Sequence, residues 1–283
     1  ALASQHPYRQ WVEGNSVEMS ELPKREHVNH SGQSVQRRQR AFGYTEEDLK
    51  LLLAPMANTG KEPLGSMGND APMAALSNRS RMLFDYFTQK FAQVTNPPLD
   101  WEREKIVTCL ESAIGPEPNL LADSELHAKK ILIPLPVLNS DEMAQLKRLD
   151  RAKLLGGYYR PFIVKGLYQV AGGGKALKER LNEIFEEIDK AIENGSNFLV
   201  LSDRDSNYAW GPIPSLLLTS AVQHHLLRRH TRTQISMVVE AGDVREIHHV
   251  ALLIAYGAAA VNPYLAFESV EDLARKGYLK VDA

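Results

Sequence analysis

With 283 residues, of which 43% are hydrophobic and 24% charged, the chain has the composition of a soluble globular protein of one large or two ordinary domains. Its 33 basic and 35 acidic side chains leave a net charge of −2, which indicates neither a nucleic-acid partner nor an anionic membrane partner. The single cysteine, Cys109, excludes an internal disulfide and any cysteine-built zinc or iron–sulfur site, and it fits a reducing compartment. Because no run of about 18 apolar residues occurs and residues 1–20 do not resemble a secretory signal, we expect a cytoplasmic protein.

The first 40 residues are polar and have no sustained period, which is typical of a linker or of an arm that lies on another surface. Thr45 can cap a helix, because the three acidic residues that follow it suit the positive end of a helix. That helix is predicted to end at Pro55. Residues 58–72 are dense in Gly, Pro, Asn and Asp, so they predict an ordered loop.

Apolar residues return at helical spacing over 78–93 and predict a second helix there. The segment TNPPLD at 95–100 interrupts this pattern, and 102–114 predict a third helix with Cys109 near its middle. That position does not support Cys109 as a nucleophile, and the chain has no G-x-S-x-G elbow. The part before about residue 130 is therefore predicted to be helices joined by loops.

From about residue 130 strand-like and helical stretches alternate in five β–α pairs. The runs FLVL and SMVV are short and continuously apolar, which is typical of strands that are covered on both faces in a parallel sheet. Five such pairs predict right-handed βαβ units in an α/β fold, with a half or partial (β/α) barrel preferred over an open doubly wound sheet. The expected strand and helix pairs are 131–138 with 140–150, 161–170 with 175–195, 197–203 with 213–230, 234–242 with 245–257, and 258–264 with 265–277.

In either arrangement functional groups gather at the carboxyl ends of the strands. Asp203, Arg204, Glu240 and Asn262 lie at three of these ends, where a barrel enzyme keeps its acid, its base and its anion clamp. Such residues also cap the helices that follow and pair with one another. Their position alone therefore does not decide between catalysis and structure.

Two further motifs suggest ligands but fit them poorly. The segment AGGGK at 171–175 resembles a phosphate-binding loop, yet Gln169 and Ala176 stand where the Walker pattern needs Gly and Ser or Thr. We interpret it as a flexible turn from strand to helix. The histidine pairs at 224–225 and 248–249 do not match H-E-x-x-H, and adjacent helical residues point about 100° apart. We therefore favour packing or interface histidines over a metal site.

The segment GSMGND at 65–70 is either a loop that contacts a neighbouring domain or an active site, or an internal turn.

Long stretches of the chain resemble one known family. Residues 51–121, which include the unusual strings GSMGND and FAQVTNPP, are similar to the large subunit of glutamate synthases. The similarity continues through ILIPLPVL, FLVLSDR, IPSLLLTSAVQHHL and VVEAGDVREIHHVALLIAYGAAAVNPYLAFE, and it covers most of residues 41–268. The resemblance implies the central domain of that subunit over 41–283, with a helical part to about 129 and a β/α part after it. Residues 1–40 are then the linker or arm.

The resemblance also implies what surrounds this domain. It implies a fold related to the FMN-binding (β/α)8 barrel but without flavin, between a glutaminase domain and an FMN-binding domain with a 3Fe–4S cluster. The parent enzyme makes two glutamates from glutamine and 2-oxoglutarate, with NAD(P)H or ferredoxin as reductant. The expected partners are those two domains of the same polypeptide and a small reductase subunit. No catalytic, cofactor-binding or metal-binding residue of the family falls in this chain, so the isolated domain is expected to be inactive.

Three hypotheses of different classes follow. The first is a structural domain that couples two active sites and helps to enclose the ammonia route between them. The second is a self-sufficient barrel enzyme that binds flavin or phosphate through Asp203, Glu240 and Lys175, and the third is a regulatory module that binds small molecules. For the first, the residues expected to face neighbouring domains are Lys61, Ser66, Asn69, Asp70, Asp203, Arg204, Glu240 and Asn262.

Overall fold

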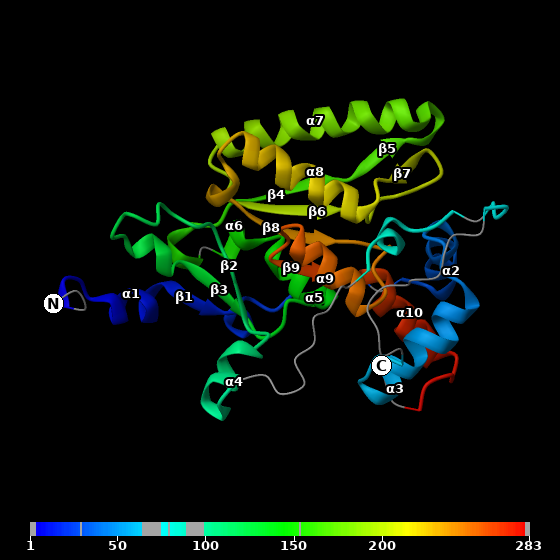
Figure 1. The fold of residues 1–283 in the computed structure, drawn as a ribbon, viewed down its shortest axis with the longest axis horizontal. Helices are drawn as coiled ribbons and strands as arrows, with labels where there is room; N and C mark the ends of the chain where they lie inside the picture. The colour runs from blue at the N-terminus through cyan, green and yellow to red at the C-terminus, as the bar shows by residue number, and fades with distance from the viewer. Residues whose placement is uncertain are drawn as a thin grey trace.

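A computed structural model describes residues 4–28, 30–63, 75–78, 80–88, 99–152 and 154–280. At its centre is a parallel sheet with the strand order β4-β6-β8-β9, shown in Figure 1. Its strands are β4 (Pro161–Lys165), β6 (Phe198–Ser202), β8 (Ser236–Glu240) and β9 (Ala260–Asn262). This confirms the prediction of a parallel sheet of β/α units.

The first strand-like segment of the β/α part lies beyond the last strand. Val137 forms a parallel bridge with Val261 of β9, and the amide of Leu138 donates to the carbonyl of Val261 at 2.8 Å. The first and the last strand segments of the β/α part are therefore neighbours, as in a barrel. No strand of the described residues joins Val137 to β4, so the sheet corresponds to a barrel with one side left open.

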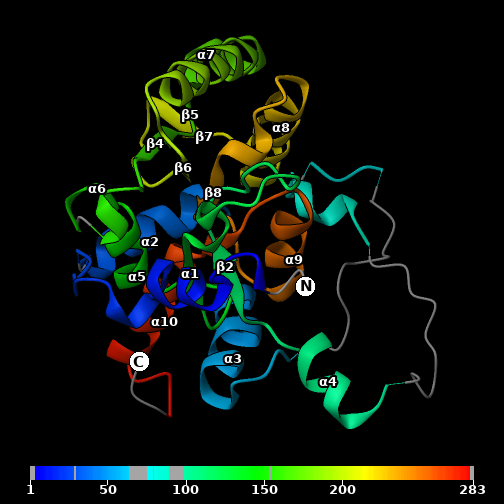
Figure 2. The ribbon, with the colours of Figure 1, turned by 90° about the vertical axis from the view of Figure 1, so that its left-hand side faces the viewer.

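The two faces of the sheet pack against different layers. In β6, Leu199 and Leu201 join a core with the helices on one face, whereas Phe198 and Val200 join a second core on the other face. Alternate side chains of a strand point to opposite faces, so a strand that is covered on both sides is apolar throughout. The principal helices are α7 (Gly173–Glu193), α8 (Ser215–Arg228), α9 (Ile247–Ala255) and α10 (Tyr264–Arg275). In Figures 1 and 2, α7 and α8 lie along one side of the sheet and α10 lies on the opposite side.

A small sheet covers the second core. It has the order β1-β3-β2 and consists of β1 (Ser16–Glu18), β2 (Ser112–Ile114) and β3 (Lys130–Ile133). The predicted strand over 131–138 is thus divided between two sheets. Two prolines, Pro134 and Pro136, lie between β3 and the bridge at Val137. Proline has no backbone N–H to donate to a neighbouring strand, so the two residues interrupt the strand. The helix predicted over 140–150 follows as two helices, α5 (Ser140–Leu146) and α6 (Leu149–Ala152).

The amino-terminal residues carry defined elements on the surface of the domain. The helix α1 (Tyr8–Asn15) precedes β1, and the helix α2 (Gly32–Ala41) packs against α10. Val35 of α2 is buried in a third core with Phe42 and with Tyr264 of α10. The division of the chain into an arm over 1–40 and a domain over 41–283 stays a prediction.

The helix after Thr45 has the predicted cap but not the predicted end. The amide of Thr45 donates to Asp48 at 2.8 Å, and the amide of Asp48 donates to the Thr45 hydroxyl at 3.1 Å, which is a reciprocal cap. A π-helical stretch η3 (Asp48–Leu53) leads into α3 (Ala54–Thr59), so the expected stop at Pro55 is wrong. Pro55 is the second residue of α3, at the junction with the π-helical stretch.

Two other helices predicted before residue 130 are shorter than expected in the described residues. Over 80–88 the chain forms only the 3₁₀ helix η4 (Leu83–Tyr86) and then extends, while residues 89–93 lie outside the described ranges. The apolar spacing there reflects packing onto other elements, since Phe84 stacks on His249 and Phe87 contacts Tyr256 edge-on. The third helix, α4 (Trp101–Val107), exists but ends before Cys109, which is exposed.

The remaining short elements connect these layers. An antiparallel pair, β5 (Leu167–Gln169) with β7 (Trp210–Pro212), extends the structure beyond β4. The 3₁₀ helices are η2 (Met19–Glu21), η5 (Glu125–Ala128), η6 (Leu154–Gly156), η7 (Val170–Gly172) and η8 (Arg232–Gln234). Among the helices described, none is both long enough and apolar enough to cross a bilayer.

Candidate functional site

The carboxyl ends of three neighbouring strands bring most of the predicted residues together. Ser202, Glu240 and Asn262 end β6, β8 and β9 in one row of the parallel register. Asp203 and Arg204 follow directly after β6. The prediction that these polar residues share one edge of the sheet is therefore confirmed, because parallel strands end at the same edge.

Glu240 is the centre of a buried charge network. Its side chain is 2% exposed and accepts from Lys147 Nζ at 2.6 Å, from Arg204 Nε at 2.9 Å and from the Ser202 hydroxyl. Burial by itself raises the pKa of Glu240, but the charges of Lys147 and Arg204 and these hydrogen bonds outweigh it and leave the pKa below its usual value. Glu240 therefore stays ionised and paired.

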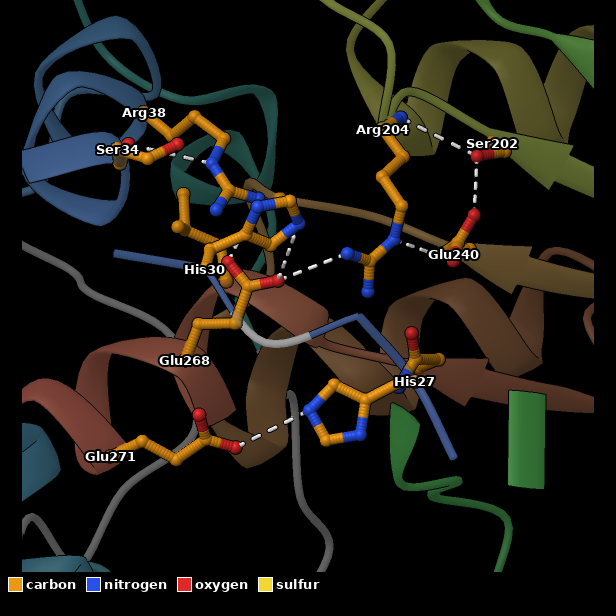
Figure 3. A network of polar contacts seen from close by, with 12 residues as sticks. His27, His30, Ser34, Arg38, Ser202, Arg204, Glu240, Glu268 and Glu271 are labelled. Atoms are coloured by element: carbon orange, nitrogen blue, oxygen red, sulfur yellow. Dashed lines mark hydrogen bonds and ion pairs between the residues drawn. The ribbon is translucent and has the colours of Figure 1, made fainter. Parts of the chain in front are cut away.

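The network continues through Arg204 to helix α10, as Figure 3 shows. Arg204 Nη1 donates to Glu268 Oε1 at 2.9 Å, and Arg38 Nη1 lies 2.8 Å from Glu268 Oε2. The guanidinium of Arg204 also lies 4.3 Å above the ring of Tyr264. His30 Nε2 is 4.0 Å from Glu268, and burial followed by the charge of Arg38 lowers the pKa of His30. The sheet, α10 and α2 are thus held together by one set of ion pairs.

Asp203 is buried beside Gly242, Asp243 and Tyr264. The amide of Gly242 donates to both of its carboxylate oxygens at 3.1 Å. Burial and the nearby Asp243 carboxylate raise the pKa of Asp203 well above its usual value, so its charge is disfavoured. A Cβ atom on Gly242 would lie 2.7 Å from Phe42 and 2.8 Å from the Tyr264 hydroxyl. Only glycine lets this amide approach the carboxyl group.

The other predicted residues within the described ranges take no part in the ion pairs around Glu240. Asn262 is 0% exposed and donates to the carbonyl of Leu138 at 2.8 Å, so it ties the segment at 136–138 to β9. Lys61 is exposed just after α3. Three of the candidates, Ser66, Asn69 and Asp70, lie outside the described residues. Whether the loops that carry these residues face neighbouring domains stays a prediction.

The residues of the two ligand-like motifs make local contacts in the described part of the chain. The turn at 172–174 begins α7, and Lys175 is 86% exposed, 3.8 Å from Glu179 of its own helix. Lys175 thus stays away from the buried carboxylates at the strand ends, and the interpretation as a strand-to-helix turn is confirmed.

The histidine pairs have structural contacts. His225 Nε2 lies 2.9 Å from Asp189 and its ring stacks on Phe185, while His249 Nδ1 accepts from the amide of Arg245 at 3.2 Å. His248 Nε2 lies 3.3 Å from the carbonyl of Phe84. Within the described ranges, no group of three or more His, Cys, Asp or Glu residues is arranged to hold a metal.

A cavity of about 1020 Å³ lies beside this end of the sheet, between the loop after β8 and segments at 40–52 and 75–85. One wall is Arg245, which pairs with Asp48 at 2.7 Å and lies 4.0 Å above the ring of Tyr44. Another wall is Asp243, whose Oδ2 accepts from the amide of Ser215 at 3.0 Å. The carboxyl end of the sheet therefore has the cavity beside Asp243 and Arg245 and, separately, the ion pairs of Glu240.

Sequence reasoning did not include three partners in this network. Lys147 caps the end of α5, Glu268 lies on α10, and Arg38 lies in the segment interpreted as a linker or arm. Glu268 lies among the apolar positions of a helix in the sequence. This pattern could have indicated that Glu268 is buried and paired, since buried charges need partners. No signal in the sequence relates Arg38 to a residue 230 positions away.

Comparison with known proteins gives a consistent result. The family model described as glutamate synthase central domain matches residues 37–283. The glutamate synthase (NADPH) large chain of Bacillus subtilis is 41% identical over 281 residues, which cover 99% of this chain and 18% of that protein. The glutamate synthase (NADH) of Schizosaccharomyces pombe is 38% identical, covering 99% of this chain and 14% of that protein. The chloroplastic ferredoxin-dependent glutamate synthase of Spinacia oleracea is 39% identical, covering 95% and 16%.

The chain therefore spans less than a fifth of the length of these three relatives. Among solved structures, a flavocytochrome b2 mutant with pyruvate bound aligns with 54% of this chain and 49% of its own, at 16% identity and a TM-score of 0.28. That similarity is too weak to support an inference about the fold or a ligand.

Proposed function

The chain belongs to the glutamate synthase central-domain family, and we propose that it is the non-catalytic central domain of a longer glutamate synthase polypeptide. It connects a glutaminase domain to an FMN-binding domain with a 3Fe–4S cluster, and it helps to enclose the ammonia route between them. The parent converts glutamine and 2-oxoglutarate to two glutamates with NAD(P)H or ferredoxin as reductant. A small reductase subunit is a further partner in this proposal.

The observation that carries a non-catalytic role is the pairing at the carboxyl end of the sheet. Glu240 and Glu268 are both 2% exposed, and each contacts two cationic side chains of this same chain. A catalytic acid or base must reach the substrate within hydrogen-bond distance. These carboxylates instead join the sheet, α10 and α2, which supports a structural role for them.

A rigid scaffold suits the transfer of ammonia between two sites. Ammonia released at one site must reach the other before it escapes or takes a proton from bulk water, so the enclosing walls need fixed geometry. Packed β–α units with a buried ion network supply such walls better than isolated loops. The cavity beside Asp243 and Arg245 is a hollow against which a neighbouring domain fits in this proposal.

The alternative of a self-sufficient flavin or phosphate enzyme has less support. It requires Lys175 near Asp203 and Glu240, yet Lys175 is exposed on the first turn of α7 and both carboxylates are buried. A purified chain with the absorbance of bound flavin near 450 nm would revive it. A regulatory role predicts that amino acids or oxo acids raise the melting temperature, because ligands that bind the native state stabilise it.

The coupling of the two half-reactions tests the proposal in the complete enzyme. We expect Arg204→Gln to raise the amount of glutamine hydrolysed per 2-oxoglutarate consumed above one to one, because Arg204 joins Glu240 to Glu268. Lys175→Gln, at the exposed start of α7, is the control and should keep the wild-type ratio. A ratio of one in Arg204→Gln enzyme that retains the wild-type melting temperature contradicts the proposal.

A surface variant tests the same proposal without disturbing the core. Lys61 is exposed, so Lys61→Glu should fold normally. If the loop at Lys61 faces another domain, this change should also raise the ratio of glutamine hydrolysed to 2-oxoglutarate consumed. An unchanged ratio removes Lys61 from the interdomain surface.

A further inference from the structure

The apolar side chains of helix α4 (Trp101–Val107) are exposed, and none of them is buried. None of its residues is buried, and the side chains of Trp101 and Ile106 are 66% and 77% exposed. Leu99, just before the helix, and Leu110, just after it, are exposed as well. In Figures 1 and 2, α4 lies at the periphery, away from the sheet and from α7 to α10. Five large apolar side chains, Leu99, Trp101, Ile106, Val107 and Leu110, thus face outward within twelve consecutive positions.

A helix of this length is not stable in water by itself. Isolated helices shorter than about 12–15 residues are marginal even with favourable sequences, and helices in proteins depend on packing of an apolar face. The stabilising contacts of α4 are local. Asp100 caps the helix by accepting from the amide of Arg103 at 2.7 Å, and Lys105 Nζ lies 4.4 Å from the centre of the Trp101 ring. Since no residue of α4 is buried by the described part of the chain, we infer that the packing a stable α4 requires comes from a surface outside the described residues.

We propose that residues 99–110 are a docking segment for a neighbouring domain of the same polypeptide. This rests on the proposed function, in which the chain is one part of a longer glutamate synthase. The three relatives compared above extend far beyond the matched region, since this chain covers only 14–18% of their lengths. A surface on the same polypeptide is present at high effective concentration, which favours it over a second molecule.

The side chains of the segment suit a buried interface centre. Trp101 is the residue type most often found as an anchor, and Ile106 and Val107 add aliphatic area beside it. Glu102 and Glu104 occupy the same helix and supply charges for a polar rim. The occupant is therefore a protein surface with an apolar pocket for Trp101.

Photo-crosslinking in the full-length polypeptide tests the proposal. p-Benzoyl-phenylalanine is placed at position 106, and a mixture of ¹⁴N and ¹⁵N copies is irradiated and digested. We expect cross-linked peptides that join residues 99–110 to a segment of the same polypeptide outside these 283 residues. Cross-links between light and heavy copies identify a second molecule and overturn the proposal, and so does the absence of any protein cross-link. Leu227, an exposed apolar residue on α8, is the control position and should not link to the same segment.

A variant measures whether the apolar surface causes the docking. With the cross-linker at position 110, Ile106→Glu should lower the yield of the intramolecular cross-link about tenfold, because an interface centre tolerates charge poorly. Since no residue of α4 is buried, the variant should still fold, and Glu102→Gln on the same helix should keep the yield. An unchanged yield in Ile106→Glu overturns the proposal.

The two proposals fail in different ways. If Arg204→Gln changes the coupling ratio but position 106 gives no cross-link, the proposed function stands and the docking segment is wrong. If the cross-link forms but neither Arg204→Gln nor Lys61→Glu changes the ratio, the docking segment stands and the role in coupling is wrong.

Discussion

The β/α half of the molecule and the segment at 99–110 use apolar residues in opposite ways. In the β/α half, every position of β6 and β8 is buried, and Leu199 and Leu201 pack against helices of the same chain. In the segment at 99–110, α4 has no buried residue, and Leu110 is 62% exposed. One region therefore buries its apolar side chains in the cores of the domain, whereas the other leaves them exposed.

In the proposals above, this difference separates the surfaces that stabilise the domain from those that connect it. Burial of apolar area is the main favourable term in folding, so the two cores that include β6 and β8 contribute much of the stability. Contiguous exposed apolar surface in a monomer usually marks an interaction site. Substitutions should accordingly affect stability in the first region and association in the second.

The largest expected effect is the loss of a partner inside the buried network. Glu240→Ala leaves Lys147 and Arg204 without their shared carboxylate, so the free energy of unfolding should fall by about 3–5 kcal/mol. Chemical denaturation of both proteins measures this difference. The control is Glu186→Ala, which removes an exposed partner of Lys190 on α7 and should leave the denaturation midpoint unchanged. Equal effects of the two changes would contradict the structural role of the network.

The next prediction compares aliphatic side chains in the two regions directly. Leu201→Ala creates a cavity in the core beneath α7 and α8 and should lower the free energy of unfolding by about 2–5 kcal/mol. Ile106→Ala on α4 removes as many carbon atoms from an exposed position and should change it by less than about 0.5 kcal/mol. A loss of several kcal/mol in Ile106→Ala would mean that α4 packs within this chain.

A smaller effect is expected where the backbone approaches Asp203. In Gly242→Ala the new methyl group meets the ring of Phe42 and the hydroxyl of Tyr264, and such overpacking costs about 1–3 kcal/mol. Gly14→Ala on α1 is the matched control, because a Cβ atom there meets nothing within 4 Å. If melting temperatures show no loss in Gly242→Ala, the close contact with Phe42 relaxes without cost.

The smallest effect is a dependence of stability on pH through Asp203. Its pKa in the folded chain is raised, so ionisation is disfavoured in the fold relative to the unfolded chain, where the pKa is near 3.9. The wild type should therefore lose stability relative to Asp203→Asn as the pH rises above about 4. Denaturation of both proteins between roughly pH 4 and pH 8 measures the difference. A difference that is constant with pH, or that changes with the opposite sign, contradicts the raised pKa.

Sequence reasoning worked where local pattern and tertiary packing agree. The amphipathic run of α7 and the continuous apolar runs of β6 and β8 were predicted, because each is long or strongly patterned. It failed for residues 80–88, where apolar spacing served packing onto His249 and Tyr256 and not a helix face. It also predicted β4 and β5 as one strand over 161–170 and missed β7, with which β5 pairs.

The candidate site divides in the same way. The row of Ser202, Glu240 and Asn262 was predictable, because the strand ends of a parallel sheet meet at one edge. Their partners were not, because the ion pair of Arg38 with Glu268 spans 230 positions and depends on how α2 packs on α10.

By itself, then, the sequence determined the succession of β–α units, the edge at which their polar ends meet and the family resemblance. Only the tertiary structure decided which charges pair there, and which apolar residues, such as Trp101, stay uncovered. The physical reason is that backbone periodicity and caps depend on neighbours within about a helical turn, whereas burial depends on surfaces brought together from distant parts of the chain.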